Sequence, residues 1–312
     1  MNVIAIVVAL GIEQWRTFRW RSALQQVFIR YARWLEHRFN GGSAQQGAIA
    51  VMLALAPPIL VAACGFWALD RLSPLLGLAW NVLILYLLVG FRHFSHAFSA
   101  IVEALKAGDA IAARRCLVAW RGSDASAVGA EEIPKLAIEQ GLGDSYCHVF
   151  GTLFWFLVLP GPAGAVLYRA TVLLAAQWQG DESTPLGQQL NAFGAPVHRL
   201  LHWLDWIPVR LTAATFAVVG DFEDAIYCWR TQAGQWPRLH EGILLASGAG
   251  ALGVLIGGAI TGPTGEPEFR PELGIGEPAD GDVLASAAGL VWRALLVWLA
   301  VLVVLTLAYW AP

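Results

Sequence analysis

Two histidines and an aspartate recur at helical spacing in a strongly apolar stretch of the chain, residues 198–224. His198, His202 and Asp205 follow at i, i+4 and i+7, so a helix would place them on one face. Such a face could be catalytic or could line a polar cavity, because ionisable side chains inside a membrane usually face one. The pattern also fits an interfacial amphipathic helix with its polar face in water. Pro208 follows one turn later and is expected to interrupt and bend the helix, since proline removes a backbone N–H.

Two other pairs of ionisable residues could do chemistry, but each has an ordinary explanation. His93 and His96 stand at i, i+3 and could ligate a metal, yet no third ligand lies close in sequence, so a helix that leaves the membrane is favoured. Glu131 and Glu132 could act as acid and base, although adjacent carboxylates on a solvated helix are common. We therefore expect no metal site. We also expect free thiols at the four cysteines, since none forms a C-x-x-C pair.

The composition indicates that these residues belong to a membrane protein. Of the 312 residues, 57% are hydrophobic and 14% are charged, and the mean hydropathy is +0.57. Soluble domains carry about 25% charged residues. The net charge of −3 gives no reason to expect a nucleic-acid partner. Membrane lipid is the expected partner, together with a second copy of the chain or a cytoplasmic protein.

Several segments have the length and apolarity of membrane spans. Three firm spans are predicted, at about 47–69, 74–91 and 284–310, and the first two should form an antiparallel hairpin. A broken span is expected over 148–176, because proline and glycine interrupt it at 160–164. The broken span would be either one kinked helix or a re-entrant pair of half-helices. Two more segments are expected to associate with the membrane, at 197–220 and 242–262.

The remaining segments are polar. Residues 13–46 have a basic amphipathic pattern, which suits anionic lipid on the cytoplasmic side. Residues 92–147 are expected to form a helical soluble loop, 177–195 a polar loop, and 263–282 a Pro/Gly/acidic loop with little helix potential. The sequence therefore predicts one all-α domain over 1–312. It would be a polytopic α-helical integral membrane protein of the bacterial inner membrane, with cytoplasmic amphipathic helices.

The order of several motifs resembles the membrane-protein superfamily that joins the cobalamin-biosynthesis protein CobD/CbiB to AmpE. The motif at 204–212, LDWIPVRLT, is the most specific and looks more like AmpE, whereas the glycine-rich run at 248–258 looks more like CobD/CbiB. The other motifs are Arg92 with His96, Gly108-Asp109 with Ala113-Arg114, Leu153-Phe154-Trp155, and 162–165 with Tyr168.

The resemblance also implies chemistry for which the chain lacks some residues. The CobD/CbiB branch joins cobyric acid to an aminoalcohol phosphate through an amide, with ATP and a divalent metal. It implies an array of Glu, Glu-Asn and Asp before the Phe-Trp pair and an Arg-Asp pair earlier, which is split here between Arg121 and Asp124. Counting back from Phe154-Trp155 matches Glu139 but leaves three positions that depart from the array, at Gly143, Asp144 and Cys147. Because the metal needs oxygen ligands, these departures argue against the synthase reaction.

Three functions are compatible with these observations. The favoured one is a divergent, non-catalytic AmpE-like protein that modulates cell-wall recycling and β-lactamase induction, with no cofactor. The alternative is a CobD/CbiB-type adenosylcobinamide-phosphate synthase with ATP and magnesium. The third is a carrier or lipid-headgroup binder that uses the broken helix. Asp205 and Arg210 are interpreted as a buried pair that holds a kinked helix. The candidate residues for a polar site are His96, Arg114, Glu139, Asp144, Asp205 and Arg210.

Overall fold

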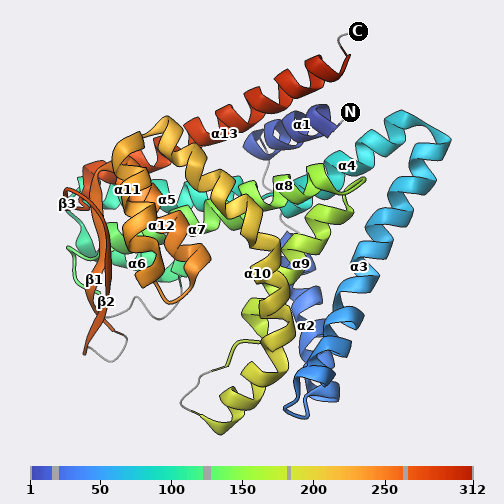
Figure 1. Cartoon of the computed structure of the whole chain (residues 1–312), viewed down its shortest axis with the longest axis horizontal. Coiled ribbons are helices and arrows are strands. Elements are labelled where there is room, and N and C mark those ends of the chain that lie inside the picture. The colour runs from blue at the N-terminus through green and yellow to red at the C-terminus, as the bar shows by residue number, and fades with distance from the viewer. Residues whose placement is uncertain (1, 16–20, 122–127, 181–183, 263–265, 311–312) are drawn as a thin grey trace. The chain divides into compact units, whose positions relative to one another are not determined.

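The computed structural model describes residues 2–15, 21–121, 128–180, 184–262 and 266–310 (Figure 1). The chain forms two compact units. Unit 1 consists of Met1–Gly90 and Cys147–Trp206, and unit 2 of Phe91–Tyr146 and Ile207–Pro312. The described residues are mostly helical, as expected, but unit 2 also contains a small β-sheet.

Unit 1 consists of helices. They are α1 (Asn2–Trp15), α2 (Arg21–Phe39), α3 (Ala44–Leu72), α4 (Pro74–Leu88), α8 (Gly151–Val158), α9 (Ala163–Gln177) and the first part of α10 (Pro185–Val219). The core lies where α2, α3, α9 and α10 meet. Trp178 is fully buried there, its ring centroid 4.7 Å from that of Phe193, and its indole N–H donates to the carbonyl of Ala32 at 3.4 Å.

The predicted hairpin of α3 and α4 is confirmed. Ser73 ends α3 with its N–H on the Leu69 carbonyl, and its hydroxyl caps α4 by accepting from the N–H of Leu75 at 3.3 Å. However, α4 ends at Leu88 rather than at residue 91, because the backbone becomes extended at Val89. Its 15 residues correspond to about 22 Å of helix, which is less than the roughly 30 Å of a hydrocarbon core.

The proline–glycine break predicted at 160–164 separates α8 from α9. Leu159 is extended and Gly161 has a φ of +67°. The two helices then pack against each other so closely that a Cβ at Gly164 would lie 1.9 Å from the carbonyl oxygen of Trp155. Since the helices fold back on one another, this segment is a pair of half-helices and not one kinked span.

Unit 2 surrounds two buried helices, α7 and α12, with further helices and a sheet. Its elements are α5 (Phe91–Lys106), α6 (Ala110–Arg121), α7 (Ile133–Ser145), the rest of α10, α11 (Phe222–Gln232), η3 (Ala233–Gln235), α12 (Leu239–Leu252), β1 (Val254–Thr261), β2 (Pro267–Gly274), β3 (Glu277–Pro278) and α13 (Gly281–Trp310). The sheet has the order β2-β1-β3, antiparallel between β1 and β2 and parallel between β1 and β3.

The sheet is a small addition to the largely helical fold that was predicted, and it corrects the prediction for 242–262. Only the first half of that segment is helical, and α12 is buried inside unit 2. Gly253, with a φ of +68°, ends the helix in the left-handed conformation that glycine adopts without strain, and the chain continues as β1. The segment 263–282, predicted as a loop, supplies β2 and β3 from its described residues, whereas residues 263–265 lie outside them.

The helix α10 corrects two further predictions. It begins at Pro185, so the second half of the predicted loop 177–195 is helical, while residues 181–183 lie outside the described residues. It also continues through Pro208 instead of being interrupted. Proline cannot donate to the carbonyl four residues earlier, which is that of Leu204. The indole N–H of Trp155 on α8 donates to this carbonyl at 3.0 Å, so it does not remain unpaired.

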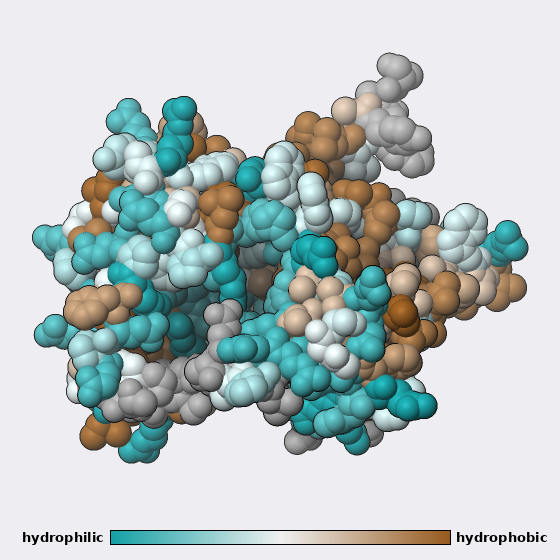
Figure 2. Space-filling model, turned by 60° about the horizontal axis from the view of Figure 1, so that its bottom comes forward, coloured by the Kyte–Doolittle hydropathy of each residue, from teal (hydrophilic) through white to brown (hydrophobic). Residues whose placement is uncertain are grey.

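Within the described part of the chain, two helices are long and apolar enough to cross a membrane, α3 and residues 281–308 of α13. The α3 helix exposes Met52, Leu60 and Val61, each between 58% and 64% accessible. In Figure 2, hydrophobic surface, coloured brown, is visible on the face of the molecule that is turned toward the viewer. Exposed apolar area on this scale marks a surface that meets lipid or another protein.

We expect a charge on the exposed face of α3 to prevent its insertion. An arginine in place of Val61 would add roughly 2.5 to 3.5 kcal/mol to the cost of placing the segment at mid-membrane depth. The variants are made in a V304R background, in which α13 cannot anchor the chain alone, and there the V61R protein should be released by alkaline carbonate from membranes of cells that express it. I111R is the control, because Ile111 is equally exposed but lies on the short helix α6. Equal retention of both variants would contradict a membrane role for α3.

We also expect Trp155 to stabilise unit 1 because it donates to the Leu204 carbonyl, which Pro208 leaves without a backbone donor. W155F should lower the free energy of unfolding by about 1 to 3 kcal/mol, since it leaves the Leu204 carbonyl unpaired. In a P208A background the new N–H can pair with that carbonyl, so the cost of W155F should shrink. Y31F is the control, because Tyr31 donates to a carbonyl in α3. If P208A changed the cost of both variants equally, as measured by denaturant unfolding in detergent, the interpretation would fail.

Candidate functional site

Glu139 is the buried acidic residue around which the polar part of unit 2 is assembled. It lies on α7 and is 6% exposed. Arg270 on β2 donates to both carboxylate oxygens, at 2.8 and 3.0 Å, in the two-pronged geometry that suits guanidinium and carboxylate. The N–H of Gly257 on β1 donates to the same carboxylate at 3.0 Å, and Nη1 of Arg121 lies 3.8 Å from it. Glu139 therefore connects α6 and α7 to both long strands.

A second carboxylate, that of Glu132, stands directly before α7 and connects this end of the helix to a later position of β1. Glu132 accepts from the N–H and the hydroxyl of Thr261, at 3.0 and 3.1 Å, and from the N–H of Gly129 at 2.8 Å. The expectation of a solvated pair therefore holds for Glu131, which is exposed, but not for Glu132, which is half-buried. These contacts indicate a structural role for Glu132.

Arg270 is the residue that sequence reasoning missed. Its guanidinium lies 5.5 Å from the ring centroid of Trp236, and its side chain is 13% exposed. The Nε atom is buried without a hydrogen-bond partner. One signal could have indicated it, because Arg270 is the only Lys or Arg in the acidic segment 263–282. A lone cation among carboxylates and prolines suggests a specific acidic partner elsewhere in the chain.

The described surroundings of the candidate residues other than Glu139 differ from one residue to the next. Asp144 lies on α7 like Glu139 but binds other groups, accepting from the indole N–H of Trp120 at 2.8 Å and from the side-chain amide of Gln140 at 3.0 Å. Nε of Arg114 donates to the carbonyl of Val128 at 2.6 Å. His96 is exposed on α5. The candidates Asp205 and Arg210 fall in different units, and both are half-buried.

The residues of the predicted histidine–aspartate face all lie on α10, and Asp205 has a described partner in unit 1. His198 is half-buried, His202 is exposed, and Asp205 accepts from the hydroxyl of Tyr168 at 3.0 Å. Tyr168 is completely buried. The motif residues Trp155, Tyr168 and Asp205 thus connect α8 and α9 to the middle of α10. These hydrogen bonds hold α8 and α9 against α10.

A π-helical segment, η2 (Tyr146–Phe150), lies between α7 and α8. The carbonyl of Cys147 there accepts from the hydroxyl of Thr152 at 3.0 Å and from Nη1 of Arg169 at 3.3 Å. Single π-turns frequently occur at functional sites. Arg169 is 4% exposed, so a positive charge is buried directly against this segment.

The described residues offer no preformed metal site. Among them, no group of three or more His, Cys, Asp or Glu side chains is arranged to hold a metal ion. The carboxylates of Glu139 and Asp144 accept from N–H donors of their own unit. The side chains of Arg92 and His93, as well as Asp124, lie outside the described residues. The described groups therefore do not fit a resident cation.

The cysteines with described surroundings are free thiols. Burial, and after it the nearby carboxylate of Asp224, raise the pKa of Cys228 to about 11. A thiol with so high a pKa is protonated at neutral pH and is a poor nucleophile.

We expect the Glu139–Arg270 pair to be essential for the stability of unit 2. E139A would leave a buried guanidinium without its carboxylate, which typically costs about 3 to 5 kcal/mol. The double variant E139A/R270A should lose less than the sum of the two single variants, since it removes both charges. E131A serves as control and should change stability by less than about 0.5 kcal/mol. Equal unfolding midpoints for E139A and E131A would refute the assignment.

Comparison with known proteins identifies the family. The model of the family described as CobD/Cbib protein matches residues 8–291. The cobalamin biosynthesis protein CobD of Stutzerimonas stutzeri strain A1501 is 36% identical over 281 residues, which cover 88% of each chain. The protein of the same name from Chromobacterium violaceum is 38% identical over 256 residues, covering 82% of this chain and 78% of its own. No solved structure matches.

These findings overturn the favoured functional interpretation. A non-catalytic AmpE-like regulator is wrong, because the similar curated proteins are named for cobalamin biosynthesis and the family match extends over most of the chain. The motif at 204–212 had seemed more typical of AmpE, but two of its residues have packing contacts inside unit 1, since the Leu204 carbonyl accepts from Trp155 and Asp205 accepts from Tyr168. The chain belongs to the CobD/CbiB family.

Proposed function

We propose that the chain is a membrane-bound synthase of cobalamin biosynthesis that joins cobyric acid to an aminoalcohol phosphate through an amide, using ATP. The observation that carries this proposal is the 36% identity over 88% of both chains to a cobalamin biosynthesis protein CobD. The helices α3 and α13 would anchor the protein in the bacterial inner membrane as a multi-pass protein. Dimerisation or a cytoplasmic partner is compatible with this function but is not needed for it.

The reaction sets chemical requirements that the chain must meet. A carboxylate does not release its oxygen to an amine directly, so ATP must first convert it to a mixed anhydride with a phosphoryl group. The amine nitrogen then forms the C–N bond, the C–O bond to the phosphoryl group breaks, and the amine gives up a proton. Cations that stabilise the phosphoryl oxygens are the main electrostatic need. Magnesium would arrive with ATP as substrate, and it requires only one or two protein carboxylates.

Arg121 is the residue of unit 2 that best suits the phosphoryl group. Its side chain is 27% exposed, so it reaches both solvent and the buried Glu139 carboxylate 3.8 Å away. Glu139 thereby fixes the position of a cation that is still accessible to a substrate. Arg270, in contrast, is 13% exposed and occupied by the same carboxylate through two hydrogen bonds.

The proposal is tested with the full-length protein purified in detergent. Cobyric acid, ethanolamine phosphate and MgATP should give a corrinoid whose mass corresponds to the amide, and omission of ATP should abolish it. The CobD protein of Stutzerimonas stutzeri serves as positive control. If that protein formed the amide while this chain did not, the proposed function would be wrong.

Within that assay, R121Q should lower kcat/KM by about tenfold to hundredfold, the effect of losing one charged hydrogen bond. R115Q is the matched control, because Arg115 is an exposed arginine on the same helix. Equal activity of the two variants would exclude Arg121 from the site without affecting the proposed reaction.

A further inference from the structure

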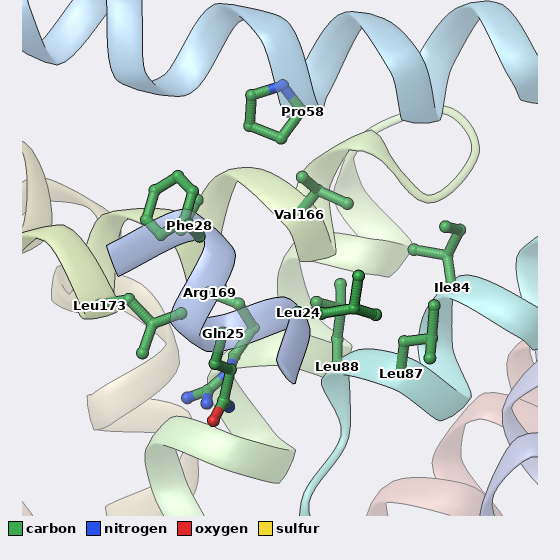
Figure 3. Close-up of a pocket in the computed structure, with 11 residues that line it drawn as sticks. Leu24, Gln25, Phe28, Pro58, Ile84, Leu87, Leu88, Val166, Arg169 and Leu173 are labelled. Atoms are coloured by element: carbon green, nitrogen blue, oxygen red, sulfur yellow. The ribbon is translucent and has the colours of Figure 1, made fainter. Parts of the chain in front are cut away.

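Unit 1 contains a cavity of about 170 Å³ between α2, α3, α4 and α9 (Figure 3). Its walls are almost entirely apolar, with Phe28, Pro58 and Ile84 among the lining side chains. Among the described lining residues, the polar ones are Arg169 and Gln25. Figure 3 shows these two side chains close together and away from Pro58, so the cavity has a polar end and an apolar end.

The polar end of the cavity is a buried side chain that contacts within unit 1 hold in place. Arg169 is 4% exposed, and its Nη1 donates to the Cys147 carbonyl in the π-helical segment η2. Thr152 donates to the same carbonyl, so the segment that holds the guanidinium is itself held. Burying a guanidinium is costly unless charged or polar groups compensate it. A guanidinium fixed against an apolar cavity is suited to an anion that carries an apolar body.

The size and lining of the cavity exclude the substrates of the proposed reaction. Pockets that enclose drug-sized ligands measure about 300 to 1,000 Å³. The cavity is therefore too small for a corrinoid or for ATP. An aminoalcohol phosphate is small enough, but its ammonium group would require a carboxylate, and none lines the cavity. One segment of an acyl chain fits both the volume and the apolar walls.

The surroundings of the cavity would supply such a ligand. Leu24, at the rim, is 50% exposed on α2 and shares that helix with exposed Trp34 and Arg30. Exposed apolar and arginine side chains on one amphipathic helix are typical of attachment to anionic lipid. The opposite wall is formed by Pro58 of α3, a helix long and apolar enough to cross the membrane.

We propose that this cavity binds one anionic phospholipid. Arg169, with Gln25, holds the phosphate group, and the first part of one acyl chain lies against Phe28, Pro58 and Ile84. The ligand contacts helices from both chain segments of unit 1, Met1–Gly90 and Cys147–Trp206. Its binding to the folded state therefore stabilises the unit by mass action. The proposal does not depend on the synthase reaction, and it is tested without corrinoid or ATP.

The test uses full-length protein in a neutral detergent, with the thermal unfolding midpoint and native mass spectrometry as readouts. Dioleoyl phosphatidylglycerol should raise the midpoint and give a one-to-one complex. Dioleoyl phosphatidylcholine should bind at least about tenfold more weakly, and inorganic phosphate should have no effect at comparable concentration. Equal binding of the two lipids would overturn the proposal, as would a shift with phosphate alone.

Variants localise the binding to the cavity. I84W fills the apolar end while Arg169 stays in place, and it should weaken phosphatidylglycerol binding at least about tenfold. R169Q should do the same, and I84W decides the matter if R169Q does not fold. R199Q is the matched control, because Arg199 is an exposed arginine of the same unit outside this cavity, and it should bind like the unaltered protein. Unchanged binding by I84W would refute the site.

Discussion

Pro57 and Pro208 each leave a backbone carbonyl without its helical donor, and an aromatic side chain on a neighbouring helix donates to that carbonyl instead. In α3, Pro57 cannot donate to Leu53, and the hydroxyl of Tyr31 on α2 does so at 2.9 Å. In α10, the indole N–H of Trp155 does the same at Leu204. In an apolar environment each unpaired carbonyl would cost several kcal/mol. The bonds therefore determine where α2 packs on α3 and where α8 packs on α10.

Unit 2 is organised by charge rather than by these aromatic donors. The Glu139 carboxylate accepts hydrogen bonds from β1 and β2 and forms an ion pair with Arg121 of α6, and α7 lies at the centre as a result. Such a pair gives little net stability compared with apolar packing, but breaking it is costly, so it favours one arrangement strongly. The arrangement that it favours places β1 and β2 against α7 and leaves Arg121 at the edge of the pair. Glu139 thus holds the elements of unit 2 together and also positions Arg121, the cation proposed for the phosphoryl group.

Much of the helical structure could be predicted, because apolar length, proline and glycine act locally. The hairpin of α3 and α4 and the break at 160–164 follow from such signals. The sheet could not be predicted, because β1 continues an apolar run from α12 and its partner β2 is polar and rich in proline. Its pairing depends on Glu139, which lies 118 residues before Gly257. Arg270 was missed for the same reason, since only the folded chain brings it to Glu139.

Counting residues gave the wrong functional interpretation because departures at a few positions were weighed more heavily than the similarity over most of the chain. The carboxylate array was aligned by counting back from Phe154-Trp155, which compares only four positions. Differences at single positions then say little about the loss of a reaction. Glu139 and Asp144 serve as acceptors within unit 2. Their carboxylates are therefore engaged by N–H donors of their own unit.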